Sequence, residues 1–247
     1  MPEGRRVYAI GDVHGRLDLL TALAAAIESD DKACAPAQTS VILLGDLVDR
    51  GPDSAGVVAF ARSWQQRREV RVLAGNHEEL FLRSFQSSDM LRHFLRHGGR
   101  ETLFSYGLDP KAYSLATVDQ VQTMMTGAVS EEERAYIAGF EDMIVLGDYV
   151  FAHAGIDPAQ PIENQISANL RWIREPFLSH KEPLGFVVVH GHTITDDPVV
   201  RTNRIGIDTG AYASGKLTAL VLEGENRRFI EAVCDKDGAI TTRVPDS

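Results

Sequence analysis

The sequence has little cysteine and no long apolar run, and each shortage excludes a class of protein. Its only two cysteines, Cys34 and Cys234, lie far apart and form no Cys-x-x-Cys pair. Neither a disulfide scaffold nor a zinc ribbon is therefore indicated, and we interpret both as free thiols. No stretch approaches the roughly 18 consecutive apolar residues of a membrane span. We expect a soluble, cytoplasmic protein that has no membrane partner.

Basic charge is also scarce. There are 25 Lys and Arg residues against 35 Asp and Glu residues, which gives a formal net charge of -10. This balance argues against a nucleic-acid partner, because such binding depends on clustered Lys and Arg side chains that neutralise phosphates. The length of 247 residues is within the range of a single α/β domain, so we expect one domain over residues 1–247. Nothing in the pattern predicts an oligomeric state.

Short apolar runs that predict buried strands recur along the chain. They lie at residues 7–10, 41–44, 70–73, 143–146, 149–152, 186–189, 204–207, 217–222 and 228–233. Between the first three, residues 17–28 and 55–67 have helical spacing, which predicts β-α-β units and a mainly parallel sheet. The late runs have short links containing Gly or Asn, which favours antiparallel hairpins. An α/β fold with two packed sheets and helices outside accommodates both halves.

The region from residue 78 to about residue 139 differs from the rest in being helical and polar. We interpret it as a helical insertion or a lid. An ordinary helical layer without a functional part explains the same pattern equally well.

Five short polar motifs each follow one of the predicted strands. They are GDVHG at residues 11–15, GDLVDRG at 45–51, GNHE at 75–78, HAG at 153–155 and HGHT at 190–193. In α/β sheets, the loops beyond the carboxyl ends of strands converge, so residues that are distant in sequence can meet there. The glycines beside the polar residues permit tight turns and close backbone approach.

The polar side chains of these motifs form a donor set suited to metal ions. Carboxylate, amide and imidazole donors without thiolate suit Mn²⁺, Fe or Zn²⁺ better than a calcium site made of oxygen alone. A lone Asp after a strand is usually a turn or cap residue, but five of the eight histidines occur in the motifs. Two ions sharing a carboxylate favour in-line displacement at phosphorus, so we expect phosphate-ester hydrolysis.

The other three histidines lie outside the motifs. His93 and His97 have i,i+4 spacing, but they lack the Glu of His-Glu-x-x-His and share a positively charged helix with other cations. We interpret them as part of a solvated helix face, and His180 as part of a surface loop.

Together the five motifs resemble the phosphoprotein phosphatase family of metallophosphoesterases, and the bacterial and phage serine/threonine phosphatases look most similar. The segment IDTGA at residues 207–211 is similar to a later segment of that group. The resemblance implies a metallophosphoesterase-like β-sandwich of two mixed sheets flanked by helices. It also implies two divalent metal ions, with Mn²⁺ expected and Fe or Zn²⁺ as alternatives.

The resemblance further implies a set of metal ligands. On this basis one ion is held by Asp12 and His14, Asp46 bridges, and the second ion is completed by Asn76, His153 and His192. The Gly-His-Thr pattern selects His192 as the last ligand. It leaves His190 as a neighbouring hydrogen-bonding or packing residue.

The family pattern also implies catalytic residues. His77 would protonate the leaving alkoxide and Asp49 would orient it, although an Asp at that position can also simply cap a turn. Arg50 would bind phosphate oxygens with its planar guanidinium. For the second arginine, the Trp-x-Arg-Glu pattern points to Arg174, with Arg171 as the alternative; an arginine on a helix surface would look the same.

These roles imply a serine/threonine protein phosphatase, in which a hydroxide bridging the metals attacks phosphorus in line. Its partner would be a phosphorylated protein or peptide, or a small phosphate ester. One alternative is a symmetrical dinucleoside polyphosphate hydrolase, which usually replaces the Asp at position 49 and has GNHD instead of GNHE. Asp49 and Glu78 favour the phosphatase. A second alternative, an inactive phosphoprotein-binding module, would be expected to lack the acid, the bridging carboxylate or the arginine.

Overall fold

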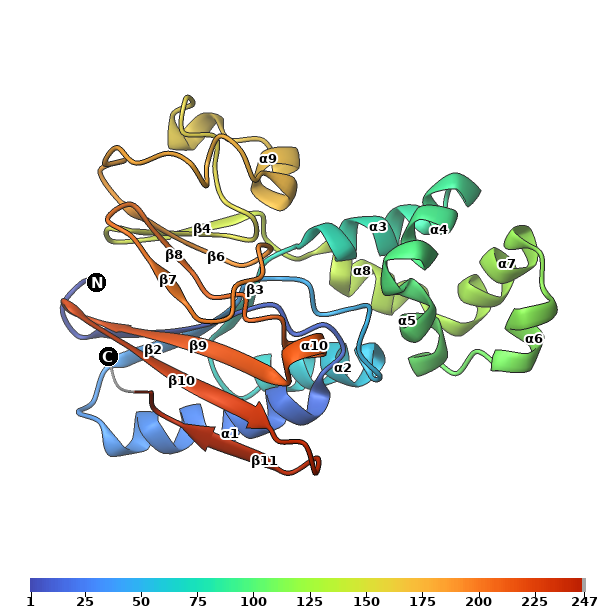
Figure 1. The fold of residues 1–247 in the computed structure, drawn as a ribbon, viewed down its shortest axis with the longest axis horizontal. Helices are drawn as coiled ribbons and strands as arrows, with labels where there is room; N and C mark the ends of the chain where they lie inside the picture. The colour runs from blue at the N-terminus through green and yellow to red at the C-terminus, as the bar shows by residue number, and fades with distance from the viewer. Residues whose placement is uncertain (246–247) are drawn as a thin grey trace.

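The computed structural model describes residues 1–245, so the last two residues of the expected domain lie outside it. Two β-sheets pack together, with helices on their outer sides (Figure 1). The first sheet has the order β11-β10-β9-β1-β2-β3 and the second has the order β4-β5-β6-β8-β7. Both sheets contain parallel and antiparallel pairs, which confirms the α/β fold with two mixed sheets.

The first sheet begins with the predicted β-α-β units. Its strands are β1 (Arg5–Ile10), β2 (Gln38–Leu43), β3 (Val70–Val72), β9 (Lys216–Glu223), β10 (Asn226–Cys234) and β11 (Ile240–Arg243). Strands β1, β2 and β3 are parallel and are connected by helices α1 (Leu17–Ala33) and α2 (Ser54–Gln65). Strands β9 and β10 pair antiparallel, as the short link between them predicted, and β11, which was not predicted, pairs antiparallel with β10.

The second sheet is less antiparallel than expected. Its strands are β4 (Met143–Leu146), β5 (Tyr149–Ala152), β6 (Val187–His190), β7 (Val199–Val200) and β8 (Arg204–Gly206). The pairs β5–β6 and β6–β8 are parallel, although the second half of the chain was expected to be more antiparallel. Long connections make this pairing possible, because parallel neighbours need a crossover. The short link before β9 does not form a hairpin either: α10 (Ala211–Ser214) occupies it and β8 and β9 belong to different sheets.

The apolar core explains why the strands are continuous apolar runs instead of alternating ones. In β1, Val7 and Ala9 pack against the second sheet, while Tyr8 and Ile10 belong to the cluster beneath the helices. Both faces of the strand are thus covered, as in parallel α/β sheets.

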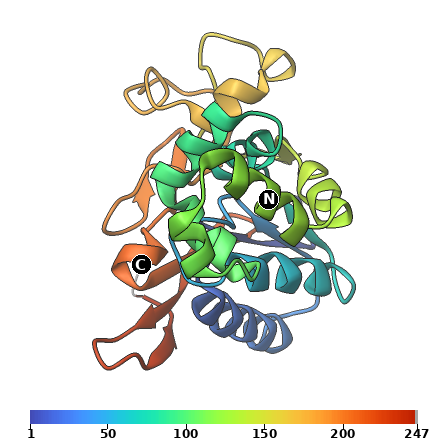
Figure 2. The same cartoon turned by 90° about the vertical axis from the view of Figure 1, so that its right-hand side faces the viewer.

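The region predicted to be helical projects to one side of the sandwich (Figures 1 and 2). It contains α3 (Asn76–Ser84), α4 (Ser88–Phe94), η1 (Leu95–Gly99), α5 (Arg100–Ser105), α6 (Pro110–Leu115), α7 (Val118–Ala128) and α8 (Glu131–Ala138). Its side chains Phe81, Phe94 and Leu103 are fully buried in the same cluster as Val48 of the second motif. The helical segment therefore packs directly against that motif loop.

Two short helices lie between β5 and β6: η2 (Ile162–Asn164) and α9 (Ser167–Trp172). None of the helices within residues 1–245 combines the length and apolarity needed to cross a membrane.

Candidate metal centre and active site

The five motifs converge in space although they are spread over about 180 residues of sequence. Each follows the end of a strand, β1, β2 and β3 in the first sheet and β5 and β6 in the second, so the site forms where the ends of both sheets meet. The side chains of the candidate ligands are almost completely buried, except for the half-buried His192; Asp12 is 1% exposed and His153 is 0% exposed. Buried polar groups this numerous require partners.

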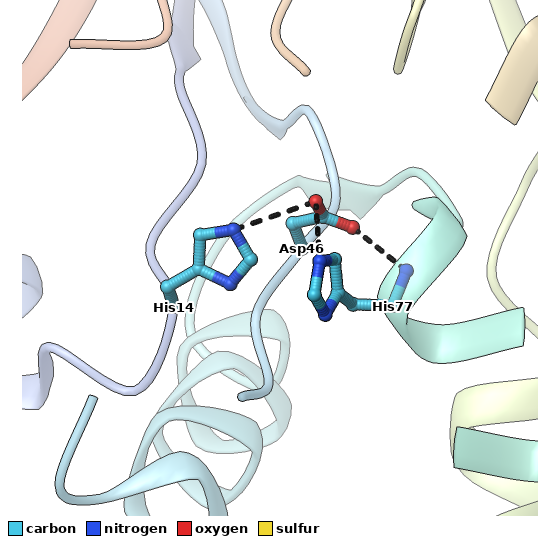
Figure 3. A group of neighbouring side chains, drawn as sticks. All are labelled: His14, Asp46 and His77. Atoms are coloured by element: carbon cyan, nitrogen blue, oxygen red, sulfur yellow. Dashed lines mark hydrogen bonds and ion pairs between the residues drawn. The ribbon is translucent and has the colours of Figure 1, made fainter. Parts of the chain in front are cut away.

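Asp46 lies at the centre of the convergence (Figure 3). Its Oδ2 atom is 3.5 Å from Nε2 of His14, 3.4 Å from Nε2 of His153 and 4.0 Å from Nε2 of His77. The carboxylate belongs to two groups that could hold a metal, one with His14 and His77 and one with His153 and His192. A residue that belongs to both groups is placed where a ligand shared by two ions would have to lie.

The second group also contains Asn76. Its Oδ1 atom is 3.0 Å from Nε2 of His153 and 2.8 Å from Nδ1 of His192. Within residues 1–245, Nε2 of His192 is buried without a hydrogen-bond partner. The backbone N–H of His192 donates to both carboxylate oxygens of Asp12, at 3.2 and 3.0 Å, which joins the first motif to the last. These oxygen and imidazole donors, without thiolate, fit a pair of divalent cations.

Two glycines give the carboxylates the space that the motif pattern predicted. A Cβ atom at Gly75 would overlap the Asp46 carboxylate, and a Cβ atom at Gly191 would overlap the Asp12 carboxylate. Both backbones therefore approach the candidate ligands more closely than any side chain would permit.

The charges of the site are unbalanced without a cation. In the described residues, no lysine or arginine forms a salt bridge with Asp12, Asp46 or Asp208, although all three are buried. Burial, together with the charges of Asp208 and Asp46, raises the pKa of Asp12 well above its usual value. Burial opposes ionisation of Asp46 as well, but His153, His77 and His14 outweigh it and lower its pKa. Divalent cations would neutralise this cluster.

Two of the three candidate histidine ligands, His14 and His192, are held in the form that binds metals, whereas at His153 the charge of Asp46 outweighs burial and raises the pKa. Burial lowers the pKa of His14 to about 3 and that of His192 to about 3. Both imidazoles are thus neutral at pH 7, which leaves a nitrogen lone pair available. Burial also lowers the pKa of His190 to about 4, but this ring lies away from the groups that could hold a metal, 5.1 Å from the Phe177 ring.

His77 and Asp49 form a buried pair. Nδ1 of His77 is 2.6 Å from Oδ2 of Asp49, and the exposed fractions of the two residues are 1% and 0%. Burial would lower the pKa of His77, but the charges of Asp46 and Asp49 outweigh it and raise this pKa. Nδ1 points toward Asp49, whose carboxylate accepts this hydrogen bond. The other ring nitrogen, Nε2, points toward Asp46 and therefore faces the centre of the site.

Arg50 extends its guanidinium across the two histidines of the first group. Nη1 donates to Nε2 of His14 and Nη2 donates to Nε2 of His77, both at 2.8 Å. The guanidinium also lies 4.8 Å from the centre of the Tyr212 ring, which favours a cation. These two hydrogen bonds use the nitrogens that metal binding and proton donation would need, Nε2 of His14 and Nε2 of His77. Both roles therefore require the guanidinium to turn away.

The two arginines left open by the sequence occupy different environments. Arg171 forms salt bridges with Asp142, at 2.6 Å, and with Glu79, at 3.5 Å. Arg174 is exposed and makes no side-chain hydrogen bond or salt bridge with any described residue. Its charge adds to burial and to the charge of His153 in lowering the pKa of His192. This arrangement favours Arg174 as the arginine available to a substrate.

Two residues of the site were not recognised from the sequence. Glu78 was interpreted only as a family discriminator, but its buried carboxylate accepts hydrogen bonds from the backbone N–H groups of Asp46, Leu47 and Gly75, at 2.7 to 2.9 Å. It therefore ties the second and third motifs together. Asp208 lies beside Asp12 and accepts a hydrogen bond from the Gly210 backbone at 2.9 Å. The only sequence signal for it was its place in the IDTGA segment.

Glu78→Gln is expected to destabilise the fold. The amide keeps the size of the side chain but turns an NH₂ group toward backbone N–H donors, and unsatisfied buried donors cost about 1–3 kcal/mol. A loss of this size corresponds to a fall in Tm of roughly 2–10 °C for a chain of this length. Thermal denaturation measures it, with exposed Glu225→Gln as the control. An unchanged Tm for Glu78→Gln would show that these hydrogen bonds do not support the site.

Residues expected to be outside the site are outside it. His93 and His97 contact each other, with Nδ1 of His97 2.8 Å from the His93 carbonyl, and neither joins a candidate metal group within residues 1–245. His180 lies in a loop that lines a cavity of about 710 Å³ together with Lys181 and Arg204. None of the motif residues lines this cavity. The candidate site is therefore identified by its metal-binding and catalytic side chains and not by the volume of a cavity.

A sandwich of two mixed sheets with buried carboxylate and imidazole groups at its strand ends defines a phosphoesterase of the two-metal class. Residues 5–218 match the family model described as calcineurin-like phosphoesterase, and the chain belongs to this metallophosphoesterase family. The family expected from the motifs is thereby confirmed. The protein is a metal-dependent phosphatase of a family that binds a dinuclear centre of divalent metals.

Relatives in the family act on different phosphate compounds. The chain is 26% identical over 232 residues to an asymmetrical bis(5'-nucleosyl)-tetraphosphatase of Bacillus velezensis, covering 85% of this chain and 86% of that protein. It is 27% identical over 220 residues to serine/threonine-protein phosphatase 1 of Salmonella typhimurium, covering 87% and 90%. A solved cold-active protein-tyrosine phosphatase of a Shewanella species shares the fold, with a TM-score of 0.61, 19% identity and coverage of 98% and 82%.

Proposed function

We propose that the chain is a serine/threonine protein phosphatase, which hydrolyses phosphate monoesters that have poor leaving groups. The buried His77–Asp49 pair, joined at 2.6 Å, is the observation that carries this proposal. A serine or threonine alkoxide leaves only if it receives a proton, which is the role of a positioned acid. The leaving group of a phosphoanhydride departs as a stabilised phosphate anion and gains much less from an acid. The pair therefore supports a monoester substrate.

The residues that would hold two divalent ions are those of the convergent motifs. In this proposal Asp12 and His14 hold one, Asp46 is shared, and Asn76, His153 and His192 hold the other. When bound, the ions supply a water that ionises near neutral pH and positive charge for the phosphate oxygens. The mixed nitrogen and oxygen donors suit Mn²⁺, with Fe or Zn²⁺ as alternatives.

The remaining steps belong to side chains of this chain. Arg50 binds phosphate oxygens through its guanidinium fork, and the exposed Arg174, whose guanidinium has no partner among the described residues, supplies the second positive charge. Both offset negative charge that develops in the transition state. Asp49 fixes the His77 ring so that Nε2 faces the site, and from this atom the proton passes to the departing oxygen.

Dinucleoside polyphosphate hydrolysis is the second candidate, and a specific finding favours it. The relative from Bacillus velezensis is named as an asymmetrical tetraphosphatase and aligns along most of both chains. The same candidate metal ligands would support hydrolysis of a phosphoanhydride as well as that of a phosphate ester. The intact Asp49–His77 pair is the reason for placing this function second, because an anhydride has less need of it.

The two functions are distinguished by comparing kcat/KM for a phosphoserine peptide with that for diadenosine tetraphosphate, on protein loaded with Mn²⁺. We expect the peptide to be preferred by at least about tenfold, which corresponds to about 1.4 kcal/mol of transition-state binding. A preference for the dinucleotide would overturn the proposal. Para-nitrophenyl phosphate serves as the common reference, and failure to hydrolyse any of the three would support a binding module instead.

A further inference from the structure

The loop that carries Asp49 and Arg50 is held in a strained conformation. Their φ angles are 73° and 68°, in the left-handed region that residues with a Cβ atom rarely adopt. Each such residue costs on the order of 1–3 kcal/mol and persists only where the surroundings enforce it. The groups that enforce it here are therefore part of how the site is built.

Much of this support comes from the helical segment, about 50 residues further along the chain. The Asp49 backbone N–H lies 2.8 Å from Oγ1 of Thr102 in α5, and 3.0 Å from Oγ of Ser54. The Arg50 backbone N–H donates to the carbonyl oxygen of Gly98, at 3.0 Å. A Cβ atom at Gly98 would lie 2.7 Å from the Arg50 nitrogen, so only glycine permits this approach.

Thr102 also contacts the Asp49 side chain. Its hydroxyl donates to Oδ1 of Asp49 at 2.6 Å, while Oδ2 of the same carboxylate accepts from Nδ1 of His77 at 2.6 Å. The two oxygens thus have different partners, which fixes the plane of the carboxylate. Thr102, Asp49 and Ser54 are all 0% exposed, so water does not compete for these hydrogen bonds.

We propose that Thr102 is a positioning residue that extends the acid pair to a chain of three, Thr102–Asp49–His77. The helical segment is then a fixed part of the active site, and it acts by aiming the His77 ring at the leaving group. This inference rests on the proposed acid role of His77. The alternative is that Thr102 only packs α5 against the loop. In that case its hydroxyl would affect stability without affecting the proton transfer.

Thr102→Val removes the hydroxyl at nearly constant volume, and Thr102→Ser retains it. We measure kcat and KM with Mn²⁺ for aryl phosphates whose leaving groups range from 2,4-dinitrophenol to phenol. Thr102→Val is expected to lower kcat for phenyl phosphate by about 10–100-fold, the usual effect of losing a supporting hydrogen bond behind a reactive group, with KM little changed. Turnover of 2,4-dinitrophenyl phosphate should stay close to that of the unmodified protein, and Thr102→Ser should restore most of the loss.

Thr123→Val is the matched control, because in residues 1–245 its hydroxyl hydrogen-bonds only within helix α7, to the Asp119 carbonyl at 3.0 Å. Metal content and thermal denaturation are measured for every variant, so that loss of fold is recognised. A uniform fall in kcat for all leaving groups, or failure of Ser to restore activity, overturns the positioning role. If His77→Asn shows no dependence on the leaving group, the acid role itself fails. The two failures are therefore distinguishable.

Discussion

His77→Asn is expected to lower kcat for a phosphoserine peptide by about 10²- to 10⁴-fold, the usual contribution of a positioned acid. The asparagine amide extends about as far as Nδ1 of the imidazole and can keep a hydrogen bond to Asp49. It lacks Nε2, the ring atom that faces the site. For 2,4-dinitrophenyl phosphate the loss should be small, because this leaving group departs without a proton. A dependence of this kind distinguishes an acid from a group that only binds phosphate.

Steady-state kinetics on both substrates measures the effect, and metal analysis is made on the same preparations. His97→Asn is a suitable control, since His97 is exposed on the helical segment and its ring hydrogen-bonds to the His93 carbonyl and lies 4.2 Å from the His93 ring. Equal losses on the two substrates would assign His77 to substrate binding. A loss of bound metal would instead show that His77 is a metal ligand, together with His14 and Asp46, which lie close to it.

Asp46→Asn is expected to have the larger effect on the metal centre. The amide can still accept the hydrogen bond from the His77 backbone, now made at 3.0 Å, so the loop should keep its shape. It lacks the negative charge shared between the two groups of candidate ligands. We expect at least one metal to be lost, and turnover to fall by about 10³-fold or more, because metal ions contribute several kcal/mol of transition-state stabilisation.

The control for Asp46→Asn is Asp148→Asn, which neutralises an exposed aspartate in the turn between β4 and β5. It tests whether a change in net charge alone alters metal affinity. Full metal occupancy in Asp46→Asn would contradict a bridging role for this residue.

Most strands of the fold were predictable because their physical signal is local. The runs at residues 7–10 in β1 and 41–44 in and after β2 are apolar, since one face meets the other sheet and the other face meets helices. Pairing was not predictable to the same extent. Whether β5 and β6 run parallel depends on the path of a connection of more than 30 residues, which apolar periodicity does not reveal. Strands β7 and β11 are short or exposed and have no clear apolar pattern.

The convergence of the five motifs was predictable, but the residues that support them were not. Strand ends converge by a general rule, so the motif that contains Asp46 was expected to meet the one that contains His153. The contact between Thr102 and Asp49 follows no such rule, because it joins a helix of polar character to a loop 53 residues earlier. A threonine at that position looks like any other helix residue. Only its burial and its two hydrogen bonds to Asp49 reveal its role.

The central claim is that buried residues of the five motifs hold two divalent ions that share Asp46. The number of Mn²⁺ ions bound by the unmodified protein, measured by equilibrium dialysis with metal analysis, tests it most directly. We expect two ions per chain, together with a magnetically coupled pair in the electron paramagnetic resonance spectrum, because a shared carboxylate holds the ions about 3.5–4 Å apart. A single ion per chain, or two ions without coupling, would contradict the claim.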